Sequence, residues 1–491
     1  MALLALIASG CTTVGPNYQK PKAPVQAVWN EGENPLIDTT PSLETDWWKS
    51  AFNDPILDQL VEDALVQNLS LRAAGLRVLQ ARQQLGIAIG NQYPQQQQLT
   101  GAAGIEGVAS SPSWEIYDLG FNLSWEVDVW GRFKRQIESA SALLDARVAD
   151  YDGVLVSLIA DVAQTYLSIR TTQQRLAVAE HNLKLQQQSV EITTAKFEGG
   201  ETSGLDVDQA QTLFFNTLAS VHSFELSLQQ LKNGLAILLG MPPHAFRGKL
   251  DAPQPIPSVS PEIALGMPQD LIRKRPDIRV AERQLAAQSA QIGFAVSELY
   301  PHLGISGSIV TAVSTSESLQ FSDLFRPETV FYDLFGFFQW NIFNYGRLKN
   351  NVRLQDAIFQ QLLEDYRQTV LQAQGEVENA IVAFLKSQQQ LKAFRSAADA
   401  AQRAADVSTE QYRDGLVNFN TVITTLRSLA TQQDQQAAIQ GTVSANLIAV
   451  YRSLGGGWQI RQGKDVIELI PGSTREEMLQ RTNYWNKTFK R

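Results

Sequence analysis

A seven-residue interval of apolar side chains runs through a proline-free stretch from about Gly131 to Phe197. The residues at this interval are Leu155, Val162, Ile169, Leu176, Leu183, Val190 and Phe197. On an otherwise polar helix, this pattern is typical of a coiled-coil seam. At about 1.5 Å of rise per residue it predicts a helix roughly 100 Å long, which is too long for an ordinary globular domain.

The same interval returns in a second stretch, at Val370, Val377, Phe384, Leu391, Ala398, Ala405 and Tyr412. Each long helix is expected to end at a glycine-containing turn, Gly199 to Gly204 in one case and Gly415 in the other, after which a second helix returns. The sequence therefore predicts two long antiparallel helical hairpins with a left-handed supercoil. From the helices alone, a structural coiled-coil rod remains an alternative.

Between the helical stretches, apolar and polar residues alternate with a period of two, which predicts strands with one apolar face. The clear cases are Leu119 to Val129, Leu303 to Val313 and Leu334 to Ile342. A weaker strand near Leu99 to Ile105 completes two hairpins, at about 97–129 and 302–344. Each strand has about the 9 to 11 residues that cross a bilayer at a tilt.

A half-buried sheet in a soluble protein would show the same alternation. In lipid, however, an open sheet edge is not tolerated, so four membrane strands would have to be pooled by several chains. Two chains would give eight strands around a side-chain-filled interior, and three chains would give twelve strands with room for a passage.

The chain also aligns with itself, which indicates an internal duplication. An offset of 207 residues matches Gly86 with Gly293 and Pro94 with Pro301, and an offset of 215 residues matches Trp125 with Trp340 and Gly200 with Gly415. The eight-residue difference arises within the hairpins, where insertions are tolerated in an exposed loop. A proline-rich stretch then joins the halves, with Pro242, Pro243, Pro253, Pro255, Pro257 and Pro261.

Composition excludes several classes of function. No apolar run reaches the about 20 residues of a membrane-spanning helix, so a helical membrane protein is not expected. The formal net charge of −9 provides no overall positive field, so nucleic acid is not an expected partner. The histidines are scattered, and no zinc-protease pair, phosphate-binding glycine loop or serine elbow is present, so we expect no enzyme activity, metal or cofactor. The four histidines are His181, His222, His244 and His302.

The single cysteine, Cys11, follows an apolar stretch from Leu3 to Ala8 and the small residues Ser9 and Gly10. This arrangement resembles the end of a bacterial lipoprotein signal peptide. Cleavage before Cys11 would leave a lipidated N-terminus, and an unmodified thiol is the alternative.

Three segments resemble the outer-membrane efflux proteins, or TolC-like channels, and in particular their lipoprotein branch. Cys11 to Tyr18 is similar to the start of the mature chain in that branch. The segment Asp118 to Arg132 ends in Trp-Glu-Val-Asp-Val-Trp-Gly-Arg and is similar to the family's strand-to-helix segment. Arg273 to Arg279, with the Ala-Glu-Arg-Gln-Leu-Ala-Ala that begins at Ala281, is similar to the opening of the second repeat. The resemblance covers nearly the whole chain.

The resemblance implies an α+β membrane protein that forms a homotrimer. Twelve strands, four per chain, would form a β-barrel in the outer membrane, continuous with a twelve-helix tunnel in the periplasm and a mixed equatorial belt. It implies a passive exit duct for small molecules, driven by an inner-membrane pump through a periplasmic adaptor and doing no chemistry itself. A duct for type I protein secretion and, less favoured, the structural rod remain alternatives.

In the family the turns between paired helices are the tips on which the adaptor docks, and they match 196–210 and 411–425 here. The resemblance implies contacts with the adaptor at Gly199, Gly200, Gly204, Leu205, Gly415, Leu416 and Val417. In the second tip, Thr421 and Thr424 stand where acidic residues are common. Asp206, Asp208, Thr421 and Thr424 are therefore candidates for lining an aperture, in which the two aspartates would supply the negative charge, because a narrow ring of carboxylates attracts cations. Solvated turn residues are the alternative for the two aspartates.

The expected organisation follows from these patterns and the resemblance. It comprises a signal-peptide remnant (1–10), an N-terminal anchor and periplasmic segment (11–55), the first repeat (56–240), the proline-rich linker (241–265), the second repeat (266–457) and a C-terminal equatorial tail (458–491).

Overall fold

The structure, a computed structural model, describes residues 13–38, 45–246, 248, 250–260, 262–264 and 272–489. Residues 1–10 and Cys11, on which the expected signal remnant and lipid anchor fall, lie outside the described residues. The chain forms two compact units, the first from Met1–Ala23, Arg77–Ala149 and Arg279–Gln368, and the second from Pro24–Leu76, Asp150–Ile278 and Thr369–Arg491.

The regular elements follow the chain in this order: β1 (Ile37–Asp38), α2 (Trp47–Phe52), α3 (Pro55–Gln67), α4 (Leu69–Gly90), β2 (Gln96–Glu106), β3 (Trp114–Val127), α5 (Arg132–Glu198), α6 (Gly204–Leu238), β4 (Ile263–Ala264), α8 (Pro276–Ser297), β5 (His302–Ser314), β6 (Val330–Gln339), α9 (Arg347–Arg413), α10 (Phe419–Ser453), α11 (Gly472–Arg481) and α12 (Asn486–Phe489). Short 3-10 helices lie at Pro243–Phe246, Thr315–Glu317, Phe321–Phe325, Pro327–Thr329, Trp458–Arg461, Val466–Leu469 and Asn483–Trp485.

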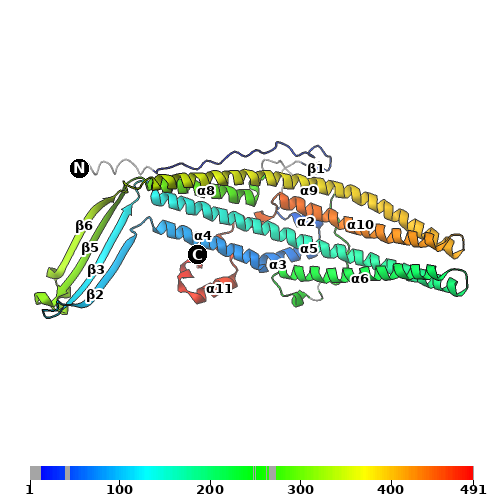
Figure 1. The fold of residues 1–491 in the computed structure, drawn as a ribbon, viewed down its shortest axis with the longest axis horizontal. Helices are drawn as coiled ribbons and strands as arrows, with labels where there is room; N and C mark the ends of the chain where they lie inside the picture. Colours follow the sequence, from blue (N-terminus) through cyan, green and yellow to red (C-terminus); the bar gives the residue numbers. More distant parts are fainter. Residues whose placement is uncertain are drawn as a thin grey trace. The chain divides into compact units, whose positions relative to one another are not determined.

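In the first unit, the four long strands form one antiparallel sheet in the order β2-β3-β5-β6 (Figure 1). This confirms the two predicted hairpins, and the second pairs directly with the first through β3 and β5. The connection between β5 and β6 is eight residues longer than that between β2 and β3, and it holds three 3-10 helices. The predicted insertion therefore lies at the tip of the second hairpin.

The pairing register confirms that the sheet has one apolar and one polar face. Cross-strand neighbours on the first face include Leu99, Phe121, Ile309 and Tyr332, which are all exposed. The next row, on the opposite face, is polar and consists of Gln98, Asn122, Ser308 and Asp333. Successive residues of a strand point to opposite faces, so the alternation in the sequence is reproduced in β2, β3 and β5. In β6 it is not, because Phe331, Phe335 and Phe337 lie on the same face as Asp333.

Two strands end earlier than the alternation predicts, at Val127 and Gln339 instead of Val129 and Ile342. After β6 the apolar pattern continues past the last paired residue, because the indole of Trp340 makes a hydrogen bond outside the sheet. The Nε1 of Trp340 donates to the carbonyl of Leu299 at 3.0 Å. A periodic side-chain pattern does not distinguish a strand from the extended chain that follows it.

The segment between β3 and α5 explains the Trp-Glu-Val-Asp-Val-Trp-Gly-Arg motif. Asp128 accepts hydrogen bonds from the backbone N–H groups of Phe133 (3.2 Å) and Lys134 (2.8 Å), which otherwise have no partner in the first turn of a helix. Gly131 has φ +77°, a conformation that glycine adopts without strain. Arg132 pairs with Glu126 at 2.9 Å. The motif therefore turns the chain from strand to helix.

In the second unit, the predicted heptad of α9 is buried at Val370, Val377, Phe384, Ala398, Ala405 and Tyr412, whereas Leu391 is only partly buried. The heptad of α5 is buried only as far as Ile169. Beyond it, the predicted seam residues are at most partly buried, and Phe197 is exposed. The fully buried positions of α5 towards its C-terminus are polar instead: Asn182, Gln186, Ser189 and Thr193. For this part of α5, the predicted apolar seam is wrong.

A further prediction about helices needs correction. Among the described residues, α5 contains one 18-residue window with a mean hydropathy of 1.2, which is apolar enough to cross a membrane by length and composition. In the structure 61% of that window is buried, and mostly buried core helices of soluble proteins pass the same test. The expectation that no stretch would pass this test was therefore too strict.

Segments outside the hairpins pack against them in the second unit. β1 and β4 form a short parallel pair that the sequence did not predict. Residues 250–252 bind α5, where Arg170 donates to the carbonyl of Ala252 (3.1 Å) and Gln173 donates to that of Leu250 (2.7 Å). The C-terminal tail is held by Arg461, which forms two hydrogen bonds with the buried Asp152 of α5.

Candidate functional site: the paired helix turns

The turns that end α5 and α9 have the same backbone geometry. In the first, Gly200 (φ +75°) donates to the carbonyl of Phe197 at 3.0 Å, and Glu201 donates to that of Lys196 at 2.8 Å. In the second, Gly415 (φ +76°) and Leu416 donate in the same way to residues of the last turn of α9, at 3.1 and 2.8 Å. This is the Schellman arrangement, in which a left-handed glycine satisfies the last carbonyls of a helix. The two tips are built alike, as the duplication implied.

The first turns of the returning helices differ. Asn418 caps α10, because its Oδ1 accepts from the backbone N–H (3.2 Å) and the hydroxyl (3.1 Å) of Thr421. Ser203 precedes α6 without a side-chain cap, and there Asp206 accepts a hydrogen bond from the hydroxyl of Thr202. A carboxylate in the first turn of α6 also suits the positive end of the helix dipole.

A basic residue that the sequence analysis did not identify connects the two tips. The Nζ of Lys196 on α5 lies 3.1 Å from a carboxylate oxygen of Glu201 and 5.3 Å from the ring centroid of Tyr412 on α9. An ammonium group at this distance from an aromatic face is attracted by its quadrupole. At the offset of 215 residues Lys196 matches Gln411, so comparing the repeats shows the difference but not its partner.

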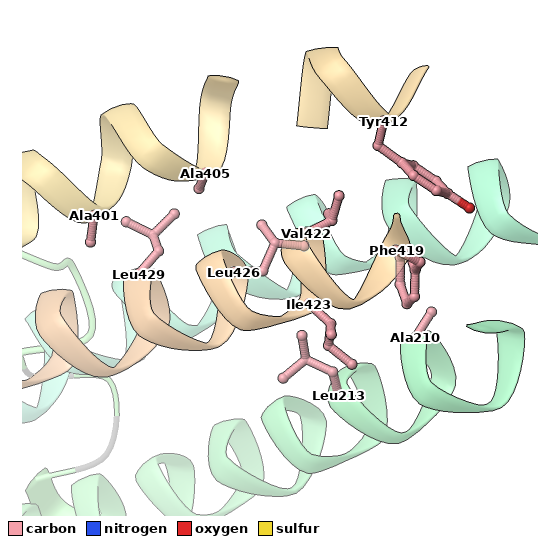
Figure 2. Close-up of a cluster of buried hydrophobic side chains, with 10 residues drawn as sticks. All are labelled: Ala210, Leu213, Ala401, Ala405, Tyr412, Phe419, Val422, Ile423, Leu426 and Leu429. Atoms are coloured by element: carbon pink, nitrogen blue, oxygen red, sulfur yellow. The ribbon is translucent and has the colours of Figure 1, made fainter. Parts of the chain in front are cut away.

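Behind the turns, one apolar cluster joins three helices (Figure 2). Its buried members are Ala210 and Leu213 on α6, Ala401, Ala405 and Tyr412 on α9, and Phe419, Val422, Ile423, Leu426 and Leu429 on α10. Residues of α5 reach it only as partly buried side chains. The tip of α10 is therefore held by apolar contacts to α9 and α6.

Further along α5 and α10, polar side chains connect the two helices. Asn182 donates to Gln433 at 2.8 Å, and Arg175 binds both carboxylate oxygens of Asp434. Gln186 is buried, and within the described residues neither of its amide atoms has a hydrogen-bond partner. Polar contacts of this kind exchange with water at a lower cost than apolar packing does. The side of α10 that faces α5 therefore combines these polar pairs with the partly buried apolar side chains of α5.

The candidate aperture residues are accessible. Asp206 is half-buried, whereas Asp208, Thr421 and Thr424 are exposed. The hydroxyl of Thr424 donates to the backbone carbonyl of Asn420 at 2.7 Å, as is common within helices. Among these four candidates, negative charge therefore comes only from the first tip.

The candidate adaptor contacts also lie at the surface. Leu205 and Leu416 are 63% and 72% exposed, which is unusual for leucine, and Val417 is packed against the apolar cluster. Beside them, a groove of about 220 Å³ runs between α5 and α9, lined by Leu185, Ile192, Asp406, Thr409 and Arg413 among others. The tips therefore present apolar side chains, and the groove is lined by both apolar and polar residues.

Within the part of the chain that the structure describes, no group of three or more His, Asp or Glu side chains could hold a metal ion. The site is thus formed by two matched turns, exposed leucines and a few charged groups.

The comparisons with known proteins identify the class. The family model described as outer membrane efflux protein matches residues 60–241 and 267–456. The pyoverdine export outer membrane protein OpmQ of Pseudomonas putida is 32% identical over 84% of this chain and 88% of its own length. The probable outer membrane lipoprotein SilC of Salmonella typhimurium is 28% identical over 92% of this chain and 97% of its own.

Among solved structures, the outer-membrane channel OprN is similar with a TM-score of 0.84 and 31% identity, over 91% of this chain and 99% of that chain. Together with the sheet and the long helical hairpins, these matches define an outer-membrane channel with a helical tunnel. The chain belongs to the outer membrane efflux protein family, and it is an outer-membrane duct for tripartite efflux. The alternative of a structural rod is therefore wrong.

Proposed function

We propose that this channel subunit works as a homotrimer, in which the sheets of three chains close into one barrel. The observation that carries the proposal is the pair of open edges on a sheet whose apolar face is exposed. Every residue of β2 and of β6 is exposed in the single chain. Open edges are not tolerated in lipid, so both strands need partners.

The two edges fit each other. β2 and β6 are different strands at opposite ends of the sheet, so the contact between copies is heterologous and produces a ring when it closes. β6 runs opposite to β2 in the antiparallel order, so β6 of one copy and β2 of the next continue the alternation. Three chains give twelve strands and a passage, whereas two would give an interior filled by side chains.

The proposed cargo is small molecules rather than the proteins of a type I secretion system. A relative whose name refers to pyoverdine export supports this, since it matches over most of the chain. The duct itself performs no chemistry. An inner-membrane pump supplies the energy, and a periplasmic adaptor transmits the cargo to the tunnel.

The adaptor docks on the two tips, at Gly199, Gly200, Gly204 and Leu205 of the first and Gly415, Leu416 and Val417 of the second. The exposed leucines support this role, because they offer apolar anchors at the end of each hairpin. Asp206 and Asp208, with Thr421 and Thr424, line the aperture. With carboxylates from one tip only, the aperture holds less negative charge than two acidic tips would provide.

Lipid at Cys11 anchors the chain to the outer membrane, with the tunnel in the periplasm. The sequence around Cys11 and the similarity to a protein named as an outer membrane lipoprotein support the anchor. The chain is divided into an anchor segment, the repeats 56–240 and 266–457, the linker between them and the tail from 458 onwards. The family model matches two separate stretches, which is consistent with that division.

The experiment is the mass and conductance of the full chain purified in mild detergent. Light scattering should give three chains per particle, and the particles should conduct ions in planar bilayers. Particles of one chain that insert into bilayers without conducting would exclude the trimeric duct. Mass spectrometry of the same sample, with Cys11→Ala as the control, tests the lipid anchor separately.

A further inference from the structure

The segment Thr13–Lys20 lies against the helices of the first unit and is held through its backbone. The backbone N–H of Val14 donates to the carbonyl of Trp130 at 3.0 Å. Arg135 on α5 donates from Nε to the carbonyl of Val14 (3.0 Å) and from Nη2 to the carbonyl of Gly15 (3.1 Å) and Oδ1 of Asn17 (3.0 Å). One side chain therefore binds three acceptors of this N-terminal strap, on Val14, Gly15 and Asn17.

The burial of Arg135 shows that this contact belongs to the folded core. Its side chain is only 1% exposed, and its Nη1 also pairs with Glu138 at 2.7 Å. A buried guanidinium needs acceptors for its five N–H groups, and the strap supplies several of them. Without the strap, α5 would keep a buried charge with few partners.

Three glycines allow the strap to approach closely enough. A Cβ on Gly15 would lie 2.4 Å from the Cα of Gly293 on α8, and Gly15 has φ +83°. A Cβ on Gly293 would lie 2.6 Å from Nε of Arg135, and one on Gly131 would lie 2.7 Å from a methyl carbon of Thr13. Backbone therefore packs directly on backbone, and the groove excludes any larger residue at these positions.

The second half of the strap is fastened by charge. Lys20 pairs with Glu282 on α8 at 2.5 Å. The guanidinium of Arg283 lies 5.8 Å from the ring centroid of Tyr18. These contacts fix the direction in which the strap runs along α8.

The duplicated sequence contains a counterpart of this groove that lacks the same features. The offset of 207 residues matches Gly293 with Gly86 on α4, and the offset of 215 matches Arg135 with Asn350 on α9. A Cβ on Gly86 would meet no atom within 4 Å. Arg135 and the close glycine contact are therefore specific to the groove that holds the strap.

We propose that Arg135, Gly131 and Gly293 form a recognition groove for the N-terminal strap Thr13–Lys20, with Arg135 as the positioning residue. The groove fixes Thr13 beside Trp130, where the chain leaves the sheet for α5. Its use rests on the proposed lipid anchor: Cys11 precedes Thr13 by two residues, so the groove sets where the lipid joins the channel. The strap docks by protein contacts and not because the lipid holds it near.

The experiment measures strap mobility by electron paramagnetic resonance of a nitroxide on Gln19→Cys, an exposed strap position. The full chain also carries Cys11→Ala, so the label reports docking without lipid. We expect a motionally restricted spectrum. Arg135→Gln and Gly293→Val should shorten the correlation time about tenfold, towards the motion of a free terminus. The matched control Gly86→Val should leave the spectrum unchanged.

A variant on the strap itself separates docking from misfolding of the helices. Gly15→Val changes only the strap, and it should mobilise the label while helix content stays that of the parent chain. If the label stays restricted in Gly15→Val, Arg135→Gln and Gly293→Val, the groove does not hold the strap. The mass of the chain with Cys11 intact reports the lipid independently, so an absent anchor and an absent groove give different results.

Discussion

Arg175 on α5 donates two parallel hydrogen bonds to Asp434 on α10, from Nε to Oδ1 at 2.8 Å and from Nη2 to Oδ2 at 2.9 Å. The same guanidinium lies 4.7 Å from the ring centroid of Phe224 on α6. Both partners of the ion pair are 34% exposed, so water weakens the attraction between the charges while both hydrogen bonds are kept. One side chain thus connects both helices of the first hairpin to α10.

Removing this pair should loosen α10 from α5. Asp434→Asn loses the charge and is expected to cost about 1 kcal/mol, which shifts an equilibrium between closed and open tips about fivefold towards the open state. Single-channel recordings in planar bilayers should show a higher mean conductance. Arg367→Gln is the control, because Arg367 pairs with Glu364 on its own helix and lies outside the tips. Equal conductance in Asp434→Asn and the parent channel would show that this contact does not restrain the tip.

The sequence predicted the elements well because each has a strong local signal. The first long helix was expected from about Gly131 to Phe197 and is found at Arg132–Glu198. The Gly131 turn and the Gly200 turn define its ends, and both glycines have a positive φ. The strands follow from a period of two, which holds in β2, β3 and β5 but is interrupted in β6 by phenylalanines on both faces.

The face of a long helix that becomes buried was less predictable. In α5 the buried heptad position Ile169 is followed by Asn182, 13 residues further on. Two full heptads would lead one residue further, to Leu183. An α-helix has about 3.6 residues per turn, so neighbouring residues point about 100° apart and a step of one residue turns the apolar heptad away from the buried face. The apolar heptad of the sequence therefore leaves the interface, and polar residues occupy it.

The contacts of the tip were not predictable, since they join residues far apart in the chain. Lys196 and Tyr412 belong to different hairpins, and nothing local in either stretch indicates that they meet. The same holds for Arg175 and Asp434. A repeat comparison finds matched turns, such as Gly200 and Gly415, but it does not find contacts made by only one repeat.

Replacing either tip glycine should destabilise its turn. Gly200→Ala and Gly415→Ala place a side chain at φ +75° and +76°, which costs about 1 to 2 kcal/mol for an L-residue. Hydrogen exchange of the amides at 199–203 or 414–418 should accelerate about tenfold in the altered tip. Gly199→Ala is the control, because its φ is not positive and its Cβ would meet only ordinary contacts. If all three variants exchange alike, the left-handed glycines do not hold the turns.

The buried pair of Asp152 and Arg461 should matter more than an exposed pair of similar length. Asp152 is 0% exposed, and its partner fastens the C-terminal tail. Asp152→Asn leaves a guanidinium without its counter-charge and is expected to cost about 3 to 5 kcal/mol. The control Asp161→Asn removes a pair with Arg452 at 3.0 Å that is about half exposed, for which roughly 0 to 1 kcal/mol is expected.

Limited proteolysis distinguishes these two variants. The tail from Trp458 onwards should be cut much faster in Asp152→Asn than in the parent chain, and Asp161→Asn should resemble the parent. Denaturant unfolding gives the difference in free energy directly. Equal losses in both variants would show that burial does not strengthen the tail contact.

Acid should weaken the N-terminal strap through Glu282. Burial raises the pKa of this carboxyl, but hydrogen bonds from Lys20 and Arg283 outweigh burial and hold it below its ordinary value of 4.5. A carboxyl whose pKa is lowered by folding stabilises the folded form above its unfolded pKa, and the contribution is lost as the pH falls through the lowered value. Strap mobility, measured with the label at Gln19→Cys, should therefore rise below about pH 4.5.

Removing one donor tests the cause of this acid response. Lys20→Gln takes away the largest of the contacts that lower the pKa of Glu282, so mobility should rise at a higher pH than in the parent chain. Lys22→Gln, at an exposed position two residues further on, should leave the transition where it is. An identical pH profile for all three chains would mean that Glu282 does not govern the strap.

The exposed apolar face of the sheet should tolerate charge less than the polar face at the same depth. Leu334 lies on the apolar face, and Ser306 lies on the polar face in the register next to it. A lysine that meets the hydrocarbon at the middle of a β-barrel costs about 2 to 4 kcal/mol, whereas one that meets the water-filled lumen costs little. Leu334→Lys should therefore reduce the amount of channel assembled in the outer membrane, and Ser306→Lys should assemble normally with altered ion selectivity. Fractionation of membranes and heat-dependent mobility of the oligomer measure the assembly. The opposite order of the two variants would place the polar face against lipid, so the comparison decides which face lines the passage.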